Sequence, residues 1–325
     1  SVVATLKGKG GGPSLMLNGH MDTVGVAGMS DPFGAEIRDG RLYGRGSQDM
    51  KGSLAAMLAA AKVLIDNRIS LKGDLVLAFV ADEEVGSIGS EAVAKQFVTD
   101  AAIVTEPTDL AICRAHRGFI WHDITTYGRA AHGSRYEEGI DAIVHMGRVL
   151  GELEKYGGEL LARSPHPLAG PPSAHASLVE GGREMSVYPD QCALRIERRT
   201  VPGENVAAAA SELNNILYHL AAADPQFKAD MQTTFDRPPF EVEEEAAVVQ
   251  ALETAVSEKL RPGRSHVGAT FWTDAAVLAA AGMETVLIGP TGAGLHSAEE
   301  WVDLQSLFDL ADILAQTAVT YCGKN

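Results

Sequence analysis

The sequence predicts an α/β fold: a mixed, mostly parallel sheet sandwiched by helices, with a ferredoxin-like α+β domain inserted into it. Three observations lead to this prediction. Short apolar runs end abruptly in polar residues, which is typical of strands buried on both faces. Helical patterns lie between these runs, so strands and helices alternate along the chain. The middle third instead alternates apolar and polar residues, as half-exposed antiparallel strands do.

The first and last parts of the chain supply the strands and helices of the parallel sheet. Each apolar run is short and bounded by polar or turn residues, which favours a strand over a buried helix. The predicted strands are residues 14–18, 75–80, 101–104 and 285–288. The predicted helices, rich in residues of high helix propensity, are residues 51–65, 87–97, 242–259 and 273–281.

The middle third supplies the second domain. Alternating patterns predict strands at residues 121–127, 175–179, 191–195 and 228–234, and helical patterns cover residues 140–156 and 205–223. The order β-α-β-β-α-β is that of a ferredoxin-like motif. We therefore expect residues 1–117 and 232–325 to form one domain, which a second domain at residues 118–231 interrupts.

Composition narrows the function classes. The chain has 325 residues, enough for two domains, and its 46% hydrophobic and 22% charged residues are typical of a globular protein. The formal net charge of −16 argues against nucleic acid and anionic membranes as partners, because both attract clustered cations. No apolar run reaches the roughly 18 residues of a membrane span.

The cysteines and the first residues bear on location and processing. Cys113, Cys192 and Cys322 lie far apart without a CxxC pair, which favours reduced thiols in a cytoplasmic protein over disulfides or a zinc ribbon. The sequence begins on a strand-like pattern, without an initiator Met or a signal peptide. We expect an N-terminal element of the first domain to be missing.

Residues that could bind a cation follow the predicted strands. His20 and Asp22 follow the first strand, Asp49 lies in a glycine-rich turn before a helix, Glu106 follows the third strand, and His296 follows a glycine-rich loop. Taken singly, each has a structural explanation. Asp49 could cap its helix, for example, and a lone histidine is usually an ordinary polar residue.

Three adjacent carboxylates, Asp82, Glu83 and Glu84, follow the second predicted strand. A solvated acidic loop would explain them, but carboxylates this close repel one another unless a cation or a proton compensates. Because functional residues of α/β sheets gather at the carboxyl ends of the strands, we expect all these groups to converge. Imidazole and carboxylate suit zinc and similar ions. The donors suffice for two metals that share a carboxylate, with another carboxylate left as base.

At these positions the sequence resembles the co-catalytic zinc peptidases and deacylases, a family that includes acetylornithine deacetylase, succinyl-diaminopimelate desuccinylase, aminoacylase and glutamate carboxypeptidase. The resemblance covers nearly the whole chain. Its motifs are Gly19-His20-Met21-Asp22-Thr23-Val24, Gly44-Arg45-Gly46 with Asp49-Met50-Lys51-Gly52, Asp82-Glu83-Glu84-Val85-Gly86, Thr105-Glu106-Pro107-Thr108, and His296. The resemblance implies a catalytic domain interrupted by a lid domain, a homodimer formed through the lid, and a further N-terminal helix and strand.

The resemblance also implies a role for each residue of the centre. The metal ligands would be His20, Asp49, Glu84, Glu106 and His296. Asp49 would bridge two ions, with His20 and Glu106 on one ion and Glu84 and His296 on the other. Asp22 would orient His20, and Glu83 would be the general base. The peptide bond after Asp49 is expected to be cis.

Further residues match the family's substrate-binding positions. His132 matches the lid histidine that stabilises the developing oxyanion, although an ordinary loop histidine is the alternative. Arg199, with Arg198 beside it, matches the arginine that binds a substrate carboxylate, although a surface ion pair is the alternative. Thr291 and Gly292 lie where the family's substrate-binding loop passes.

The expected activity is metal-dependent hydrolysis of the amide bond of a small N-acyl amino acid. A hydroxide bridging two metal ions would attack the carbonyl, and Glu83 would take the proton of the water and pass it to the leaving amine. Zinc is the expected metal, with cobalt or manganese as alternatives. A glutamate at position 106 resembles the deacetylases and desuccinylases, whereas several di- and tripeptidases have aspartate there.

There are three alternatives to this activity. A carboxypeptidase or dipeptidase of the same chemistry is the first. A non-catalytic binding relative is the second, but it predicts a lost ligand or base, and none is lost. A nucleotide-binding α/β protein is the third, but the sequence lacks GxGxxG and GxxxxGK[ST] loops.

Overall fold

The computed structural model describes residues 1–26, 28–260 and 265–324, and it divides the chain into two compact units. The first unit comprises Ser1–Ala115, Glu241–Ala269 and Thr273–Asn325, and the second comprises His116–Phe240 with Thr270–Trp272. The predicted boundary after residue 231 is wrong. It would cut strand β11 (Lys228–Arg237), which pairs along its length with β8 (Gly118–Tyr127) and therefore belongs wholly to the second unit.

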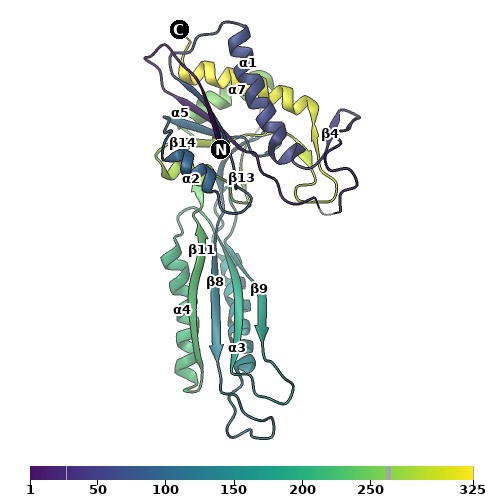
Figure 1. The fold of residues 1–325 in the computed structure, drawn as a ribbon. Helices are drawn as coiled ribbons and strands as arrows, with labels where there is room; N and C mark the ends of the chain where they lie inside the picture. The colour runs from purple at the N-terminus through teal and green to yellow at the C-terminus, as the bar shows by residue number, and fades with distance from the viewer. Residues whose placement is uncertain (27, 261–264, 325) are drawn as a thin grey trace. The chain divides into compact units, whose positions relative to one another are not determined.

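The first unit is built on a mixed, eight-stranded sheet, which confirms the predicted fold class (Figure 1). Its parallel centre consists of the four apolar strands that the sequence predicts, whose side chains are almost all buried. Antiparallel strands flank this centre. The order is β1 (Val2–Leu6), β5 (Leu75–Val80), β2 (Leu15–His20), β6 (Ala101–Val104), β14 (Glu284–Leu287), β7 (Ile112–His116) and β12 (Phe240–Glu241), with β13 (His266–Ala269) paired to β7.

Helices cover both faces of this sheet. On one face, α1 (Gly52–Asp66), α5 (Ala247–Lys259) and α7 (Leu304–Cys322) form the main core with strand residues such as Leu17 and Leu77. On the other face lie α2 (Ile88–Ala94) and α6 (Ala275–Ala280), which contact each other. Figure 1 shows α1 and α7 on the opposite side of the sheet from α2. The sequence predicts all of these helices except α7.

A small second sheet of short strands lies next to Ser47–Lys51, the helical turn that leads into α1. Its order is β15 (Gly292–Ala293), β16 (Trp301–Asp303), β4 (Arg41–Tyr43) and β3 (Ile37–Arg38). Because Trp301 pairs with Tyr43, the segments just outside these strands, around residues 300 and 44, also lie together. The sequence does not predict this sheet.

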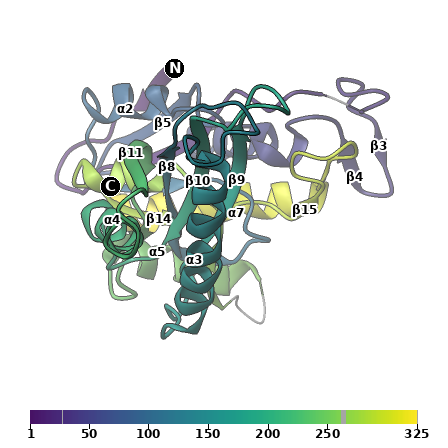
Figure 2. The same ribbon diagram turned by 90° about the horizontal axis from the view of Figure 1, so that it is seen from below.

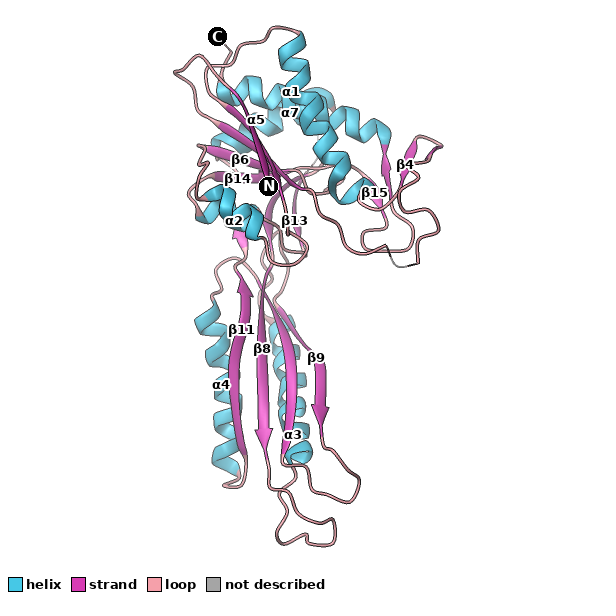
Figure 3. Ribbon diagram, viewed as in Figure 1, coloured by secondary structure: helices cyan, strands magenta, loops and turns pink. Residues whose placement is uncertain are grey.

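The second unit has the predicted ferredoxin-like order. Its four antiparallel strands lie in the order β11, β8, β10 (Gln191–Thr200), β9 (Ser173–Gly181). Figures 2 and 3 show α3 (Ala142–Ala162) and α4 (Val206–Ala223) on the same face of this sheet. Alternate strand residues such as Ile124 and Leu194 are buried beneath the helices, while the other face is more exposed.

No helix in the described part of the chain has both the length and the apolar character that crossing a membrane requires.

Candidate metal centre

The five predicted metal ligands lie together at one edge of the main sheet, three of them at or after the ends of strands of that sheet and two in neighbouring loops. His20 is the last residue of β2, Glu84 lies in the turn after β5, and Glu106 follows β6. Asp49 lies in the turn Ser47–Lys51 that leads into α1, and His296 lies in the loop between β15 and β16. The carboxyl ends of parallel strands share an edge, which explains why segments so distant in sequence meet here.

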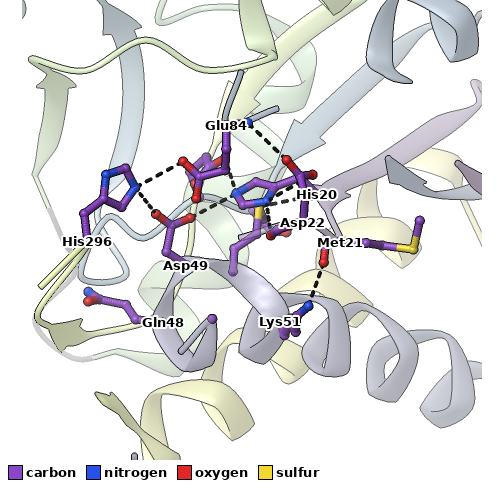
Figure 4. A network of polar contacts seen from close by, with 12 residues as sticks. His20, Met21, Asp22, Gln48, Asp49, Lys51, Glu84 and His296 are labelled. Atoms are coloured by element: carbon purple, nitrogen blue, oxygen red, sulfur yellow. Dashed lines mark hydrogen bonds and ion pairs between the residues drawn. The ribbon is translucent and has the colours of Figure 1, made fainter. Parts of the chain in front are cut away.

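Asp49 lies between the two histidines (Figure 4). His20 Nε2 is 3.0 Å from Asp49 Oδ1, and His296 Nε2 is 3.3 Å from Asp49 Oδ2. Glu106 Oε1 lies 3.6 Å from His20 Nε2, whereas Glu84 Oε2 lies 3.1 Å from His296 Nε2. The ligand atoms thus form two groups, each within 4.8 Å, and each group uses a different oxygen of Asp49.

The electrostatics of the centre favour a bound cation. Burial raises the pKa of Glu83 well above its usual value, and the nearby carboxylates of Glu106 and Asp274 raise it further. Burial likewise raises the pKa of Glu84, and it raises the pKa of Glu106 to about 8. For His20, burial lowers the pKa, but the carboxylates of Glu106 and Asp49 outweigh this effect and raise it to about 11.

The donors present fit two divalent ions. Three carboxylates and two imidazoles are the usual ligands of zinc-type ions, and Asp49 offers one oxygen to each group. Among the residues that the structure describes, the buried Glu84 Oε1 has no hydrogen-bond partner, which is costly unless a ligand satisfies it. Protons or cations must offset the repulsion among these carboxylates, and two divalent ions would do so.

Asp22 forms its hydrogen bond with His20 through its main-chain carbonyl and not through its carboxylate. His20 Nδ1 lies 3.0 Å from the main-chain oxygen of Asp22, while the Asp22 carboxylate is 3.8 Å away. The carboxylate instead accepts hydrogen bonds from the main-chain N–H groups of Asp82 and Glu84, at 2.8 and 3.2 Å. Asp22 therefore meets His20 through its main-chain carbonyl, whereas its carboxylate holds the turn that carries Glu83 and Glu84.

Glu83 lies in that same turn, beside the predicted ligand Glu84 but outside both groups of candidate ligands. It is half-buried, and burial together with the nearby carboxylates of Glu106 and Asp274 raises its pKa. Such a group is available for proton transfer. The Asp49–Met50 peptide bond is cis, as expected from the resemblance.

Sequence reasoning missed three charged groups at the centre. Glu300 and Arg45 form an ion pair of 2.7 Å with almost no exposed side-chain surface. Asp274, at the start of α6, is buried; it accepts a hydrogen bond from the Ser90 hydroxyl at 2.5 Å, and burial raises its pKa to about 6. The sequence offered only weak signals of these three groups. Arg45 stands inside a glycine-rich motif, Glu300 directly precedes a short strand, and Asp274 directly precedes a short helix.

The second unit carries the predicted lid residues. His132 is exposed in a loop, with Nδ1 2.9 Å from the Ser134 hydroxyl. Arg199 is partly exposed and donates from Nε to Glu197 at 2.6 Å. Arg198 is fully buried, with donors bonded to Tyr156, Glu204 and the carbonyl of Arg199. A side chain placed in this way cannot reach a ligand, so Arg198 is a structural residue and not the substrate contact that was expected.

Thr291 and Gly292 lie in the first unit, at the start of the loop that carries His296. The main chain of Thr291 is tied to the start of α7 through Ser306 and Asp303. A Cβ at Gly292 would overlap the Trp301 carbonyl and Gln48, so the glycine allows the close approach of neighbouring segments.

The chain is similar in sequence to known proteins along nearly its whole length. A model described as Peptidase family M20/M25/M40 matches residues 16–320. Acetylornithine deacetylase from Myxococcus xanthus is 30% identical over 330 residues, which cover 99% of this chain and 84% of that protein. N-formyl-4-amino-5-aminomethyl-2-methylpyrimidine deformylase from Bacillus subtilis is 30% identical over 358 residues, covering 100% and 83%.

Solved structures share the fold. A tripeptidase from Staphylococcus aureus matches with a TM-score of 0.80 and 20% identity, covering 98% of this chain and 84% of that one. A dinuclear metal-binding peptidase of the M20 family from Bacillus subtilis matches with a TM-score of 0.75 and 18% identity, covering 98% and 83%.

Proposed function

The chain belongs to peptidase family M20/M25/M40, and on that premise we propose that it hydrolyses the amide bond of small N-acyl amino acids with the help of two divalent metal ions. Family membership makes it an enzyme that acts on amides. The observation that carries the proposal is Asp49, whose two carboxylate oxygens face two separate groups of ligands.

His20 and Glu106 would hold one ion, Glu84 and His296 the other, and Asp49 both. When bound, the ions would polarise the amide carbonyl and make a water molecule more acidic. Zinc suits this set of nitrogen and oxygen ligands best, and cobalt or manganese could replace it. Because every ligand and Glu83 is present, nothing in the donor set favours a non-catalytic relative.

Glu83 acts as the general base in this proposal. Its raised pKa lets it accept a proton from the attacking water and later release that proton to the leaving amine. Asp22 keeps Glu83 in place, because its carboxylate binds the main chain on both sides of that residue. His132 would donate a hydrogen bond to the developing oxyanion, and Arg199 would bind the substrate carboxylate.

Two relatives that are each 30% identical to this chain have names that describe the removal of a small acyl group. Acetylornithine deacetylase removes an acetyl group, as its name states, and the deformylase a formyl group. Together with glutamate at position 106, this similarity supports a deacylase acting on a small amide. A carboxypeptidase or dipeptidase activity is the competing outcome.

The lid unit supports a homodimer. Its edge strand β9 is largely exposed, including the side chains of Leu178 and Val179. An exposed edge strand offers unpaired N–H and C=O groups to a partner chain, so the second copy would pair here.

The three unpaired cysteines, all buried, fit the reducing conditions of the cytoplasm.

A hydrolysis screen tests the proposal. N-acetyl, N-succinyl and N-formyl amino acids are compared with dipeptides, each with and without a chelator. We expect hydrolysis of at least one N-acyl amino acid, its loss with the chelator, and its return with added zinc. Preferential cleavage of dipeptides would transfer the assignment to the peptidases, and hydrolysis that the chelator leaves unchanged would contradict the metal mechanism.

A further inference from the structure

Glu300 is a buried carboxylate around which the turn that carries Asp49 is wrapped. Its side chain has no exposed surface. Oε1 accepts hydrogen bonds from the main-chain N–H groups of Gln48 and Asp49, at 2.9 and 3.0 Å. Oε2 accepts from the N–H of Gly46 at 2.9 Å and from the Arg45 guanidinium at 2.7 Å. Four donors thus satisfy one carboxylate, which makes its burial tolerable.

Arg45 extends this network to the loop that carries His296. Its Nη2 donates to the carbonyl of Ser297, the next residue along the chain, at 2.7 Å. Its Nε donates to the carbonyl of Gly25 at 3.1 Å. One guanidinium therefore joins the His296 loop, residue 25 and Glu300, a task that suits its planar fork of donors.

The candidate ligands are held in different ways, according to the segment that carries each of them. His20 ends β2 and Glu106 follows β6, so the ladder of the main sheet positions both. Asp49 and His296 lie in loops outside that ladder. The N–H of Asp49 and the carbonyl after His296 are both bound by the Arg45–Glu300 pair.

We propose that the buried Arg45–Glu300 ion pair positions the metal site formed by Asp49, Glu84 and His296. The pair holds the Asp49 turn and the His296 loop at the separation that an ion between them requires. Neither residue is a ligand. The inference rests on the proposed function only for the presence of two ions.

Glu300→Gln tests the proposal at its centre. The glutamine has the same shape, but its NH₂ group can only donate, so N–H groups that bound one oxygen lose their acceptor. Arg45→Lys is the second variant: it keeps the positive charge, but one ammonium cannot make the three contacts of the guanidinium. Glu204→Gln is the matched control, because Glu204 also accepts from a buried arginine and from a main-chain N–H, but in the other unit.

The measurement is a calorimetric titration of each metal-free protein with zinc, together with its unfolding temperature. In Glu300→Gln we expect one of the two zinc sites to lose about 10–100-fold in affinity, the range for residues that orient metal ligands. The other site, formed by His20, Glu106 and Asp49, should lose less, because the main sheet holds His20 and Glu106. Arg45→Lys should show the same split. In both variants, raising the zinc concentration should restore kcat, and the KM for the amide substrate should stay at the wild-type value. Glu204→Gln should lower the unfolding temperature and leave both zinc affinities unchanged.

Two results would overturn the inference: wild-type affinity at both sites in the two variants, or an equal loss at both sites that merely follows a fall in unfolding temperature. If Glu300→Gln does not fold, Arg45→Lys decides alone. A wild-type protein that binds fewer than two zinc ions would instead contradict the proposed function, so the two failures are distinct.

Discussion

Glu83 is the carboxylate that the ligand groups leave free. Replacing it with glutamine removes the proton acceptor and keeps the size of the side chain. We expect Glu83→Gln to lower kcat by about 10²–10⁴-fold, the usual contribution of a general acid–base residue. Metal analysis of the same sample should still find two ions per chain. Hydrolysis within a few-fold of the wild type, with both ions bound, would exclude Glu83 as the base.

The neighbouring arginines of β10 should respond differently to the same change. Arg199 is partly exposed and is the proposed partner of the substrate carboxylate. Arg199→Gln should therefore raise KM by about 10-fold or more, because the charge-assisted bond to that carboxylate, worth roughly 1.5–3 kcal/mol, is lost. Arg198 is buried and paired with Glu204, so Arg198→Gln should cost about 3 kcal/mol of stability. Kinetics and chemical denaturation separate the two effects. A KM that changes only in the Arg198 variant would reverse the assignment.

Single residues also show where sequence reasoning stops. The order of strands and polar residues predicts that His20, Glu84 and Glu106 meet, because the carboxyl ends of parallel strands lie at one edge of the sheet. The pattern does not reveal that Asp22 meets His20 through its carbonyl, or that Glu300 binds the turn of Asp49. Those contacts are made to main-chain atoms, which every residue has, so they leave no mark in the sequence.

At the scale of elements, the end of β14 packs closely against the end of β6. A Cβ at Gly289 would overlap the carbonyl of Glu106, so Gly289→Ala must displace this proposed metal ligand. We expect a loss of about 1–3 kcal/mol in stability, as for other overpacked sites, and weaker metal binding. Gly147→Ala is the control, since a Cβ there meets nothing within 4 Å. That variant, inside α3, should be about 0.5–1 kcal/mol more stable.

Denaturation and zinc titration of both glycine variants provide the measurement. Equal stability of the Gly289 variant and the wild type would show that the two strand ends can separate without harm to the centre.

The elements that the sequence predicts are those with enough residues to form a pattern. β5, β6 and α1 appear within a residue or two of their predicted bounds. The two- and three-residue strands β3, β4 and β15 are too short to show a period, and only pairing with distant segments creates them. α7 is a different case, because its signals are present: Asp303 caps it and an apolar stripe faces α1 and α5.

At the scale of the whole molecule, the centre links stability to pH. In the metal-free protein the pKa of Glu106 is raised to about 8 and that of His20 to about 11. Both folded-state values lie above the unfolded ones of about 4.3 and 6.5, so the folded protein binds more protons. Stability from these groups is therefore greatest at low pH. It is lost as the pH rises from about 4.3 through 8 for Glu106, and from about 6.5 through 11 for His20.

Metal ions compete with the same protons. We therefore expect the rise in unfolding temperature on adding zinc to be small near pH 5 and to grow steadily toward about pH 8. Thermal unfolding with zinc and with chelator, at several pH values, measures this difference. A difference that stays constant or shrinks with increasing pH would show that the bound ions do not displace protons from this centre.

The central claim is that two ions held by His20, Asp49, Glu84, Glu106 and His296 enable amide hydrolysis. The most direct measurement is a titration of the metal-free protein with zinc while hydrolysis of the best N-acyl amino acid is recorded. We expect no hydrolysis without metal, and a rate that rises until two ions are bound per chain. Full hydrolysis in the metal-free protein, or a maximum reached with the Asp49→Ala variant as readily as with the wild type, would contradict it.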